Sequence, residues 1–257
     1  MNKIFGFVLA FSFVACNSGD KKNDTLSNTD LIQQNLKGKV QLFEDNATII
    51  DSLGKSKVDS TISIADFDAR GYQSTYTTKD LTGKVTMEQQ MKHNPDGTFS
   101  EMITKKNGKQ TESLVTEAKD GKYTSGKTYD STGKQDSYYT DLKTNENGVV
   151  YAGKQHFMDD RIKSTFDMKY DGPHFLGGTT TDSTGKTIYT GTVKLNDKGD
   201  AMEENMTTVE KDITKKEILT YKYDSYDDKG NWTQRTTYND KGKPTKIIKR
   251  TFSYFKD

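Results

Sequence analysis

Adjacent carboxylates come closest to a catalytic pattern in this chain. The doublets are Asp159 with Asp160, Glu203 with Glu204, and Asp227 with Asp228. Glycosidase-type hydrolysis needs two carboxyl groups at a fixed separation, one of them shielded from water so that its pKa rises. Neighbours on a strand point to opposite faces, so the doublets fit solvated turn charges better. We expect no catalytic residue and no enzymatic activity, and keep a glycan hydrolase that uses an Asp/Glu pair as the weakest alternative.

Metal and nucleotide chemistry find no support in the sequence. The histidines, His93, His156 and His174, lack metal-ligand spacing, both among themselves and with the only cysteine, Cys16. Segment 66–71 lacks the remaining ligands and the closing glutamate of a calcium loop. There is no phosphate-binding glycine loop and no nucleophile elbow. We therefore expect no metal and no other cofactor.

Trp232, the only tryptophan, is the one side chain that suggests a ligand contact. Exposed, it would suit stacking on a sugar or a peptide; buried, it would pack in the core of a sheet. We expect the buried position and keep ligand stacking by Trp232 as the alternative. The surrounding segment 221–255 has the densest aromatic residues, so we expect it to be the best-packed part of the fold.

The N-terminal residues have the pattern of a targeting signal. Lys3 is followed by an uncharged apolar run, residues 4–13, too short to span a bilayer as a helix. Small Ala15 then precedes Cys16. This arrangement resembles a bacterial lipoprotein signal, although Phe13 stands where leucine is usual. The resemblance implies cleavage behind Ala15, lipidation of Cys16 and attachment to a membrane through that lipid.

The chain divides into three predicted segments. Residues 1–15 are the lipoprotein signal peptide. Residues 16–36 hold the lipidated cysteine and a polar, flexible tether, in which 30–36 could form one helical turn. Residues 37–257 form a β-strand repeat domain.

Composition indicates a polar but folded chain. Only 31% of residues are hydrophobic and the mean hydropathy is −0.90, so disorder is the competing interpretation. Fourteen tyrosines, twelve phenylalanines and a regular strand pattern favour order. The 38 basic and 37 acidic residues include one in the signal, Lys3, so the mature chain is formally neutral. No overall field would attract nucleic acid, which we exclude as a partner.

Turn tetrads that end in glycine recur along the chain. Asp or Asn at the first position of most tetrads caps the turn, and glycine at the last supplies a positive φ. The twelve glycines, mostly 11 to 15 residues apart, are Gly54, Gly71, Gly83, Gly97, Gly108, Gly121, Gly133, Gly148, Gly185, Gly199, Gly230 and Gly242. We predict positive φ in particular at Gly133, Gly185, Gly230 and Gly242.

Between the turns lie segments rich in Thr, Tyr, Val and Ile. Several alternate with period two, with one face shared within each of the runs 85–91, 162–170, 232–238 and 248–254. Period two with one apolar face is typical of a half-buried antiparallel strand. We therefore predict an all-β fold, a long antiparallel meander of roughly 13–16 strands. We expect it to be strongly twisted and curled, with a partly open barrel as one form it could take.

A family resemblance covers roughly residues 36–257, and firmly only the last forty. Its residues are Leu36-Lys-Gly-Lys-Val40 at the domain start, the Asp-x-x-Gly turns, Tyr226-Asp-Asp-Lys-Gly-Asn-Trp-Thr-Gln-Arg235 and Tyr238-Asn-Asp-Lys-Gly242. Together they resemble the Rhs/YD-repeat-like lipoproteins common in Bacteroidetes. Upstream turns lack the full Tyr-Asp signature. The resemblance implies a repeat fold and an envelope location, and its motif carries no catalytic group.

These observations favour a non-enzymatic cell-envelope lipoprotein that acts as a binding or scaffold module. Its partners would be the membrane, through the N-terminal anchor, and an envelope protein or glycan held by the faces or edges of the sheet. The expected location is the outer membrane, facing the periplasm or the cell surface. The first alternative is a carrier that encloses a small apolar ligand in a partly closed β cavity.

Overall fold

The computed structural model describes residues 29–256, most of which belong to strands. One short helix, α1 (Asp30–Gln33), comes first. The sixteen strands are β1 (Val40–Ile50), β2 (Ser56–Phe67), β3 (Gln73–Asp80), β4 (Val85–His93), β5 (Phe99–Lys106), β6 (Lys109–Lys119), β7 (Lys122–Asp130), β8 (Gln135–Thr144), β9 (Val150–Phe157), β10 (Ile162–Asp171), β11 (His174–Asp182), β12 (Thr187–Leu195), β13 (Ala201–Glu210), β14 (Ile213–Tyr226), β15 (Trp232–Tyr238) and β16 (Pro244–Tyr254). Within this part of the chain, no helix is long and apolar enough to cross a membrane.

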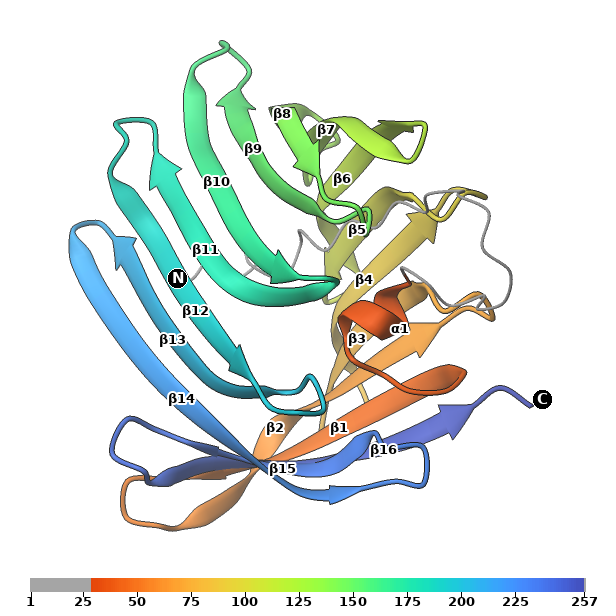
Figure 1. Ribbon diagram of the computed structural model, residues 1–257, viewed down its shortest axis with the longest axis vertical. Coiled ribbons are helices and arrows are strands. Elements are labelled where there is room, and N and C mark those ends of the chain that lie inside the picture. The colour runs from red at the N-terminus through yellow and green to blue at the C-terminus, as the bar shows by residue number, and fades with distance from the viewer. Residues whose placement is uncertain (1–28, 257) are drawn as a thin grey trace.

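The strands form a closed antiparallel barrel (Figure 1). Each strand pairs with its neighbours in the sequence, and β1 pairs with β16 to complete the ring. Antiparallel neighbours can be joined by short hairpins, which the recurrent glycine turns supply. The predicted all-β meander is confirmed, and of the forms considered the structure adopts the barrel, fully closed.

The predicted turn glycines all have positive φ, from 66° at Gly242 to 91° at Gly71. In the β7–β8 turn, Asp130 Oδ1 accepts hydrogen bonds from the backbone N–H groups of Thr132 (2.8 Å) and Lys134 (3.1 Å). The first residue of the tetrad therefore caps the turn with its side chain, while the glycine takes a conformation that a Cβ would strain.

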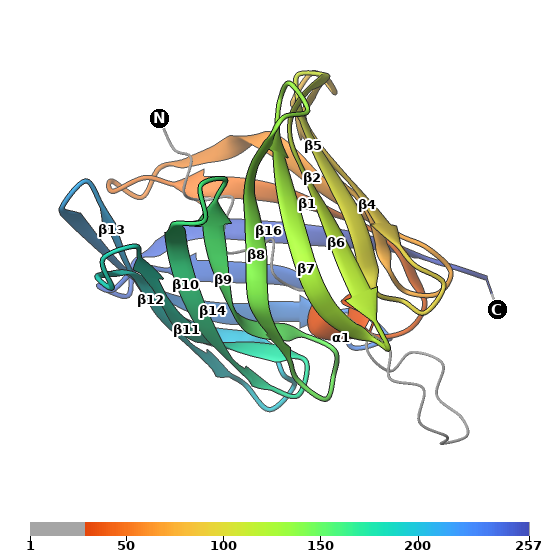
Figure 2. The same ribbon diagram turned by 90° about the horizontal axis from the view of Figure 1, so that it is seen from above.

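The meander gives the barrel two different ends (Figure 2). We call the end at which odd-numbered strands finish the open rim, and the end at which α1 lies the helix end. At the helix end, the residue after the turn glycine is buried in five turns: Tyr72, Thr98, Val149, Asp200 and Asn231. At the open rim, the same position is an exposed lysine in six turns: Lys55, Lys84, Lys109, Lys134, Lys186 and Lys243.

Residues 29–37 cross the helix end and belong to the fold. Leu31 and Leu36 are buried, 2% and 7% exposed. Asn35 Nδ2 donates to Lys198 O in the β12–β13 turn (2.9 Å), and Leu31 N donates to Gly71 O in the β2–β3 turn (3.2 Å). The expected helical turn is present. The tether expected over 16–36 is corrected at its C-terminal end, because two leucines in it complete the core; residues 1–28, with Cys16 and the predicted signal, lie outside the described residues.

Inward side chains pack in three separate clusters, because sixteen strands enclose a lumen too wide for opposite walls to fill. The largest has eight buried residues on β5–β10, among them Met102, Tyr139 and Phe166. A second joins α1 to β1 and β2, and the third contains Ala47, Trp232 and Ile248. The expectation that 221–255 is the best-packed part is therefore wrong. Dense packing requires inward apolar residues on several adjacent strands, and β5–β10 supply these.

A β-bulge turns Trp232 inward. The register between β14 and β15 shifts between Ser225 and Tyr226, where Tyr226 pairs with Trp232. A shift of one residue moves a side chain to the other face. Trp232 thus joins Ile248 in the core, whereas alternation had placed it on the face of Tyr238.

The outer wall is charged. Cross-strand ion pairs join Lys92 to Glu101 at 2.6 Å and Lys194 to Glu203 at 2.8 Å. Their lysines are 68% and 65% exposed. These two ion pairs place charges of both signs on the outer wall.

Candidate functional site

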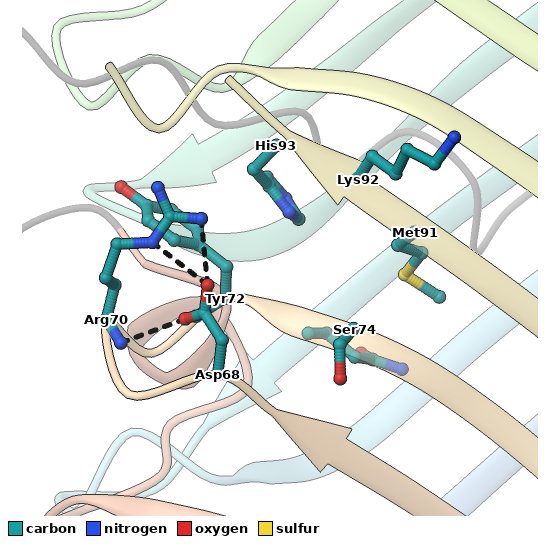
Figure 3. Close-up of a pocket in the computed structure, with 8 residues that line it drawn as sticks. Asp68, Arg70, Tyr72, Ser74, Met91, Lys92 and His93 are labelled. Carbon is teal, nitrogen blue, oxygen red and sulfur yellow. Dashed lines mark hydrogen bonds and ion pairs between the residues drawn. The ribbon is translucent and has the colours of Figure 1, made fainter. Parts of the chain in front are cut away.

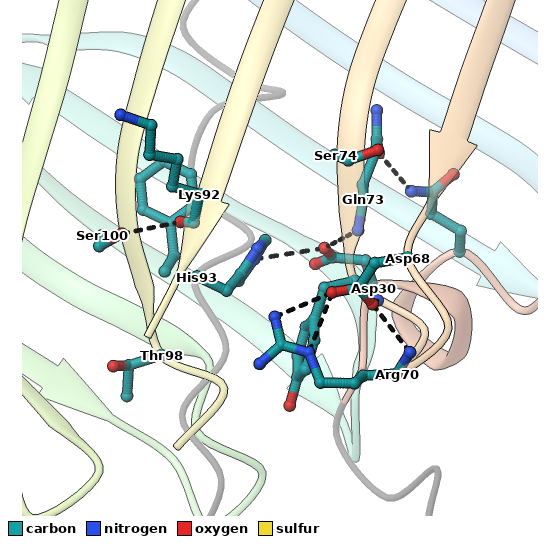
Figure 4. A network of polar contacts seen from close by, with 12 residues as sticks. Asp30, Asp68, Arg70, Gln73, Ser74, Lys92, His93, Thr98 and Ser100 are labelled. Carbon is teal, nitrogen blue, oxygen red and sulfur yellow. Dashed lines mark hydrogen bonds and ion pairs between the residues drawn. The ribbon is translucent and has the colours of Figure 1, made fainter. Parts of the chain in front are cut away.

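A polar network at the helix end fixes α1 to the barrel (Figure 4). Asp30 Oδ2 accepts a hydrogen bond from Gln73 N on β3 (2.6 Å) and lies 3.4 Å from His93 Nε2 on β4. The His93 ring stacks on Tyr72 with 4.7 Å between ring centroids. Gln34 Nε2 also donates to Gln73 Oε1 (2.7 Å). The contacts hold the start of the described chain against two strands.

Burial sets the protonation of this network. Burial, followed by the nearby charge of Asp68, raises the pKa of Asp30 to about 7. Burial also lowers the pKa of His93 to about 4. Both shifts favour the neutral form, because a charge without a well-solvated partner is costly inside a protein. Between about pH 4 and pH 7 the contact between Asp30 and His93, at 3.4 Å, is therefore one between neutral groups.

A pocket of about 280 Å³ lies beside the network (Figure 3). Its lining comes from the β2–β3 turn, β3 and β4: Asp68, Arg70, Tyr72, Gln73, Ser74, Met91, Lys92 and His93.

Asp30 is not among the lining residues, and Asp68 is occupied by its own turn. Asp68 Oδ1 accepts from the N–H groups of Arg70 and Tyr72, and its Oδ2 accepts from Arg70 Nε (3.0 Å). Asp68 is the one acidic residue that lines this pocket, so no second carboxyl group faces it there. The network is suited to holding α1.

A second candidate site faces the lumen on β14 and β15. The Arg235 guanidinium lies over the rings of Tyr221 (4.6 Å) and Trp232 (5.0 Å). Arg235 pairs directly with Tyr223 in the sheet, so the two side chains share the inner face. The buried Nε atom of Arg235 has no hydrogen-bond partner. An N–H group in this position is costly unless something accepts from it.

The neighbouring Arg250 on β16 differs in having its charge matched. Its Nε and Nη2 atoms each lie 2.6 Å from a carboxylate oxygen of Asp45. Its guanidinium also lies over Trp232 (3.9 Å) and Phe43 (3.8 Å). Within residues 29–256 no salt bridge includes Arg235, so of the two lumenal arginines it is the one whose charge has no carboxylate partner and whose Nε has no acceptor.

The surroundings of Arg235 combine aromatic and polar groups. Tyr221, Tyr223, Glu204 and Met206 are only half-buried although the register places them on the inner face. Inner-face residues that remain partly exposed indicate a lumen open to water. Burial, and then the negative charge of Glu204, raise the pKa of Tyr221, so its phenol stays protonated. The Tyr223 hydroxyl donates to Ala201 O (2.7 Å). The site thus offers a cation and aromatic faces.

The structure places Trp232 and the three carboxylate doublets in different parts of the barrel. Trp232 is buried, 8% exposed, as expected, and contacts both lumenal arginines. Asp159 and Asp160 lie in the β9–β10 turn, and Asp227 and Asp228 in the β14–β15 turn, while Glu203 faces outward and Glu204 inward. Within the described residues, no group of three or more His, Cys, Asp and Glu side chains could hold a metal ion.

Sequence reasoning missed both arginines, although a signal was present. Only four of the 38 basic residues are arginine, and Arg235 and Arg250 both follow the single tryptophan closely. Arginine stacks on aromatic rings and binds carboxylates in a fork, which lysine does not. The contact between Asp30 and His93 could not be predicted in this way, because the two residues lie 63 positions apart in the sequence.

Comparison with solved structures shows the fold. A porin-like protein from Bacteroides uniformis matches with a TM-score of 0.55 at 12% identity, covering 84% of this chain and 98% of its own. A porin-like protein from Bacteroides vulgatus matches at 11% identity with the same coverage and a TM-score of 0.36. A chain of the TcdB2-TccC3-Cdc42 complex matches at 13% identity and a TM-score of 0.30, over 80% of this chain and 11% of that one. No protein-family model and no curated protein matches the sequence.

Proposed function

We propose that this protein is a lipid-anchored binding protein of the bacterial envelope, and that its ligand binds inside the barrel. The observation that carries the proposal is Arg235, whose buried Nε lacks an acceptor while its guanidinium lies over two aromatic rings. A ligand with an anionic group and a flat apolar body would accept from the guanidinium and lie along Tyr221 and Tyr223.

The barrel architecture supports a chamber that is entered from one side. Residues 29–37 join turns on different sides of the helix end, where the residue after the turn glycine is also buried in five turns. The open rim has exposed lysines at the same turn position. The ligand would therefore enter through the open rim and approach β14 and β15 from there.

The location belongs to the same proposal. Residues 1–16 resemble a lipoprotein signal, and the porin-like fold occurs in Bacteroides proteins. The charged outer wall favours a barrel held beside a membrane over one inserted in it, because a membrane-spanning barrel has an apolar outer band. The finer assignment, an Rhs/YD-repeat-like lipoprotein of the outer membrane with Cys16 lipidated, is part of the proposal.

Trp232 provides the test for the lumenal site, because it is the only tryptophan and touches Arg235. The probe is 8-anilino-1-naphthalenesulfonate, an anionic aromatic dye, titrated into the full chain carrying Cys16→Ser. We expect energy transfer from Trp232 to the bound dye. Arg235→Gln should weaken that binding about tenfold or more, because a hydrogen bond to a charged group is lost.

Two controls make the result specific. Arg161→Gln removes an arginine at the open rim and should leave binding unchanged, as should Leu53→Ser in a rim turn. Equal dye binding by Arg235→Gln and the parent would reject the lumenal site and leave the scaffold function as the better proposal.

The anchor is tested separately by cell fractionation. Two acyl chains hold a protein on a membrane stably, since each buried CH₂ contributes ~0.8 kcal/mol. We expect Cys16→Ser to move the protein from the membrane fraction to the soluble fraction. Unchanged partitioning would place the anchor elsewhere.

A further inference from the structure

Exposed apolar side chains gather at the open rim. Eleven large apolar residues are exposed in the described chain, and nine of them lie in or beside rim turns; the other two are Met202 and Ile218. The most prominent are Leu53 (79% exposed) and Ile213 (73%). A one-sided collection of this kind is typical of an interaction surface.

Four of these exposed apolar residues have a basic residue close by in the same turn. Leu53 is followed by Lys55, Leu81 by Lys84 and Met158 by Arg161, while Lys211 precedes Ile213. All four basic residues are exposed. The pattern occurs on four hairpins, β1–β2, β3–β4, β9–β10 and β13–β14, distributed around the ring.

Carboxylates in the β1–β2 and β3–β4 turns are turned back toward the chain. Asp51 Oδ1 accepts from the N–H groups of Leu53 and Lys55, both at 2.9 Å. Asp80 Oδ1 accepts from the N–H groups of Thr82 (2.9 Å) and Lys84 (3.1 Å). The carboxylates are thus engaged by their own backbone, and the apolar tip and the lysine remain exposed.

We propose that the open rim docks on the surface of a bilayer that contains anionic lipids. Tips on a ring can touch a flat surface together, and Leu, Ile and Met beside lysine fit the boundary between acyl chains and phosphates. The described chain begins at the opposite end of the barrel, so the docking surface is separate from the proposed anchor.

Vesicle flotation of the full chain carrying Cys16→Ser tests the proposal. The vesicles are phosphatidylcholine alone, or phosphatidylcholine with phosphatidylglycerol. One rim variant combines Leu53→Ser, Leu81→Ser and Ile213→Ser; the other combines Lys55→Gln, Lys84→Gln and Lys134→Gln. Matched controls combine Met202→Ser with Ile218→Ser, and Lys119→Gln, Lys122→Gln and Lys229→Gln at the helix end. The N-terminal apolar run is common to all of them.

We expect binding to the anionic vesicles that weakens with added salt. Either rim variant should lower the partition coefficient by about tenfold or more, with the controls close to the parent. Rim variants that bind as the parent does, or a parent that does not distinguish the two vesicles, would overturn the proposal. So would sedimentation equilibrium showing a parent dimer that the rim variants lose, since the rim would then contact a second copy. Melting curves verify that each variant is folded.

Discussion

Asp30 and His93 give the molecule two opposite dependences on pH. The pKa of Asp30 is raised by burial to about 7, so its contribution to stability is complete below 3.8 and is lost as the pH rises through about 7. The pKa of His93 is lowered by burial to about 4, so its contribution is complete above 6.5 and is lost as the pH falls through about 4. Between pH 4 and 6.5 the two slopes oppose each other.

Replacing Asp30 by Asn should therefore uncover the slope of His93. We expect the melting temperature of the parent to change little between pH 4.5 and 6.5, and that of Asp30→Asn to rise with pH over this range. The difference should approach about 1.4 kcal/mol per pH unit at most. Thermal melting at several pH values measures it.

Asp228→Asn is the matched control, because this carboxylate is 82% exposed. Its melting curve should run parallel to that of the parent. If Asp30→Asn also ran parallel, the carboxylate of Asp30 would not be desolvated as the structure places it.

At the scale of the element, glycine acts in two ways. In the β7–β8 turn, a Cβ on Gly133 would meet nothing within 4 Å, so only its φ of +81° demands glycine. On β11, Gly178 has a φ of +153°, and a Cβ there would in addition lie 2.5 Å from Asp167 O on the next strand. The turn glycine serves conformation alone, and the strand glycine also serves the close approach of two backbones.

The two substitutions should differ in magnitude. Gly133→Ala should lower the free energy of unfolding by about 1–2 kcal/mol, the strain of a left-handed residue. Gly178→Ala should lower it by about 3 kcal/mol or more, because backbone on β10 must move. Urea denaturation of both variants measures the difference, and equal losses would contradict the close approach at β11.

The turns and strands were predicted best from the sequence, because they depend on local chemistry. Asp and Asn caps with glycine at positive φ located the hairpins. The predicted face of Trp232 failed at a bulge, which depends on how β14 pairs with β15 and has no signature in the local alternation.

At the scale of the whole molecule, the barrel closes between the first and the last strand. Asp45 on β1 pairs with Arg250 on β16, and the two side chains are 17% and 11% exposed. A partly buried pair of this kind is sensitive to the loss of one partner, because the other charge remains desolvated.

Asp45→Ala should therefore destabilise the barrel by about 3–5 kcal/mol. Glu101→Ala is the control: its partner Lys92 is 68% exposed, so we expect a loss of about 0–1 kcal/mol. Equilibrium unfolding in urea compares the two variants. A similar loss in both would mean that the seam between β1 and β16 is solvated like the outer wall.

The sequence by itself determined the repeating hairpins and the all-β class. These follow from φ at glycine, side-chain caps and period-two alternation, all of which act within a few residues. Only the tertiary structure decided that the ring closes, that residues 29–37 cross one end, and that Arg235 meets Tyr221 and Trp232 in the lumen. These features depend on strand register summed around sixteen strands and on contacts between distant residues, and local propensity specifies neither.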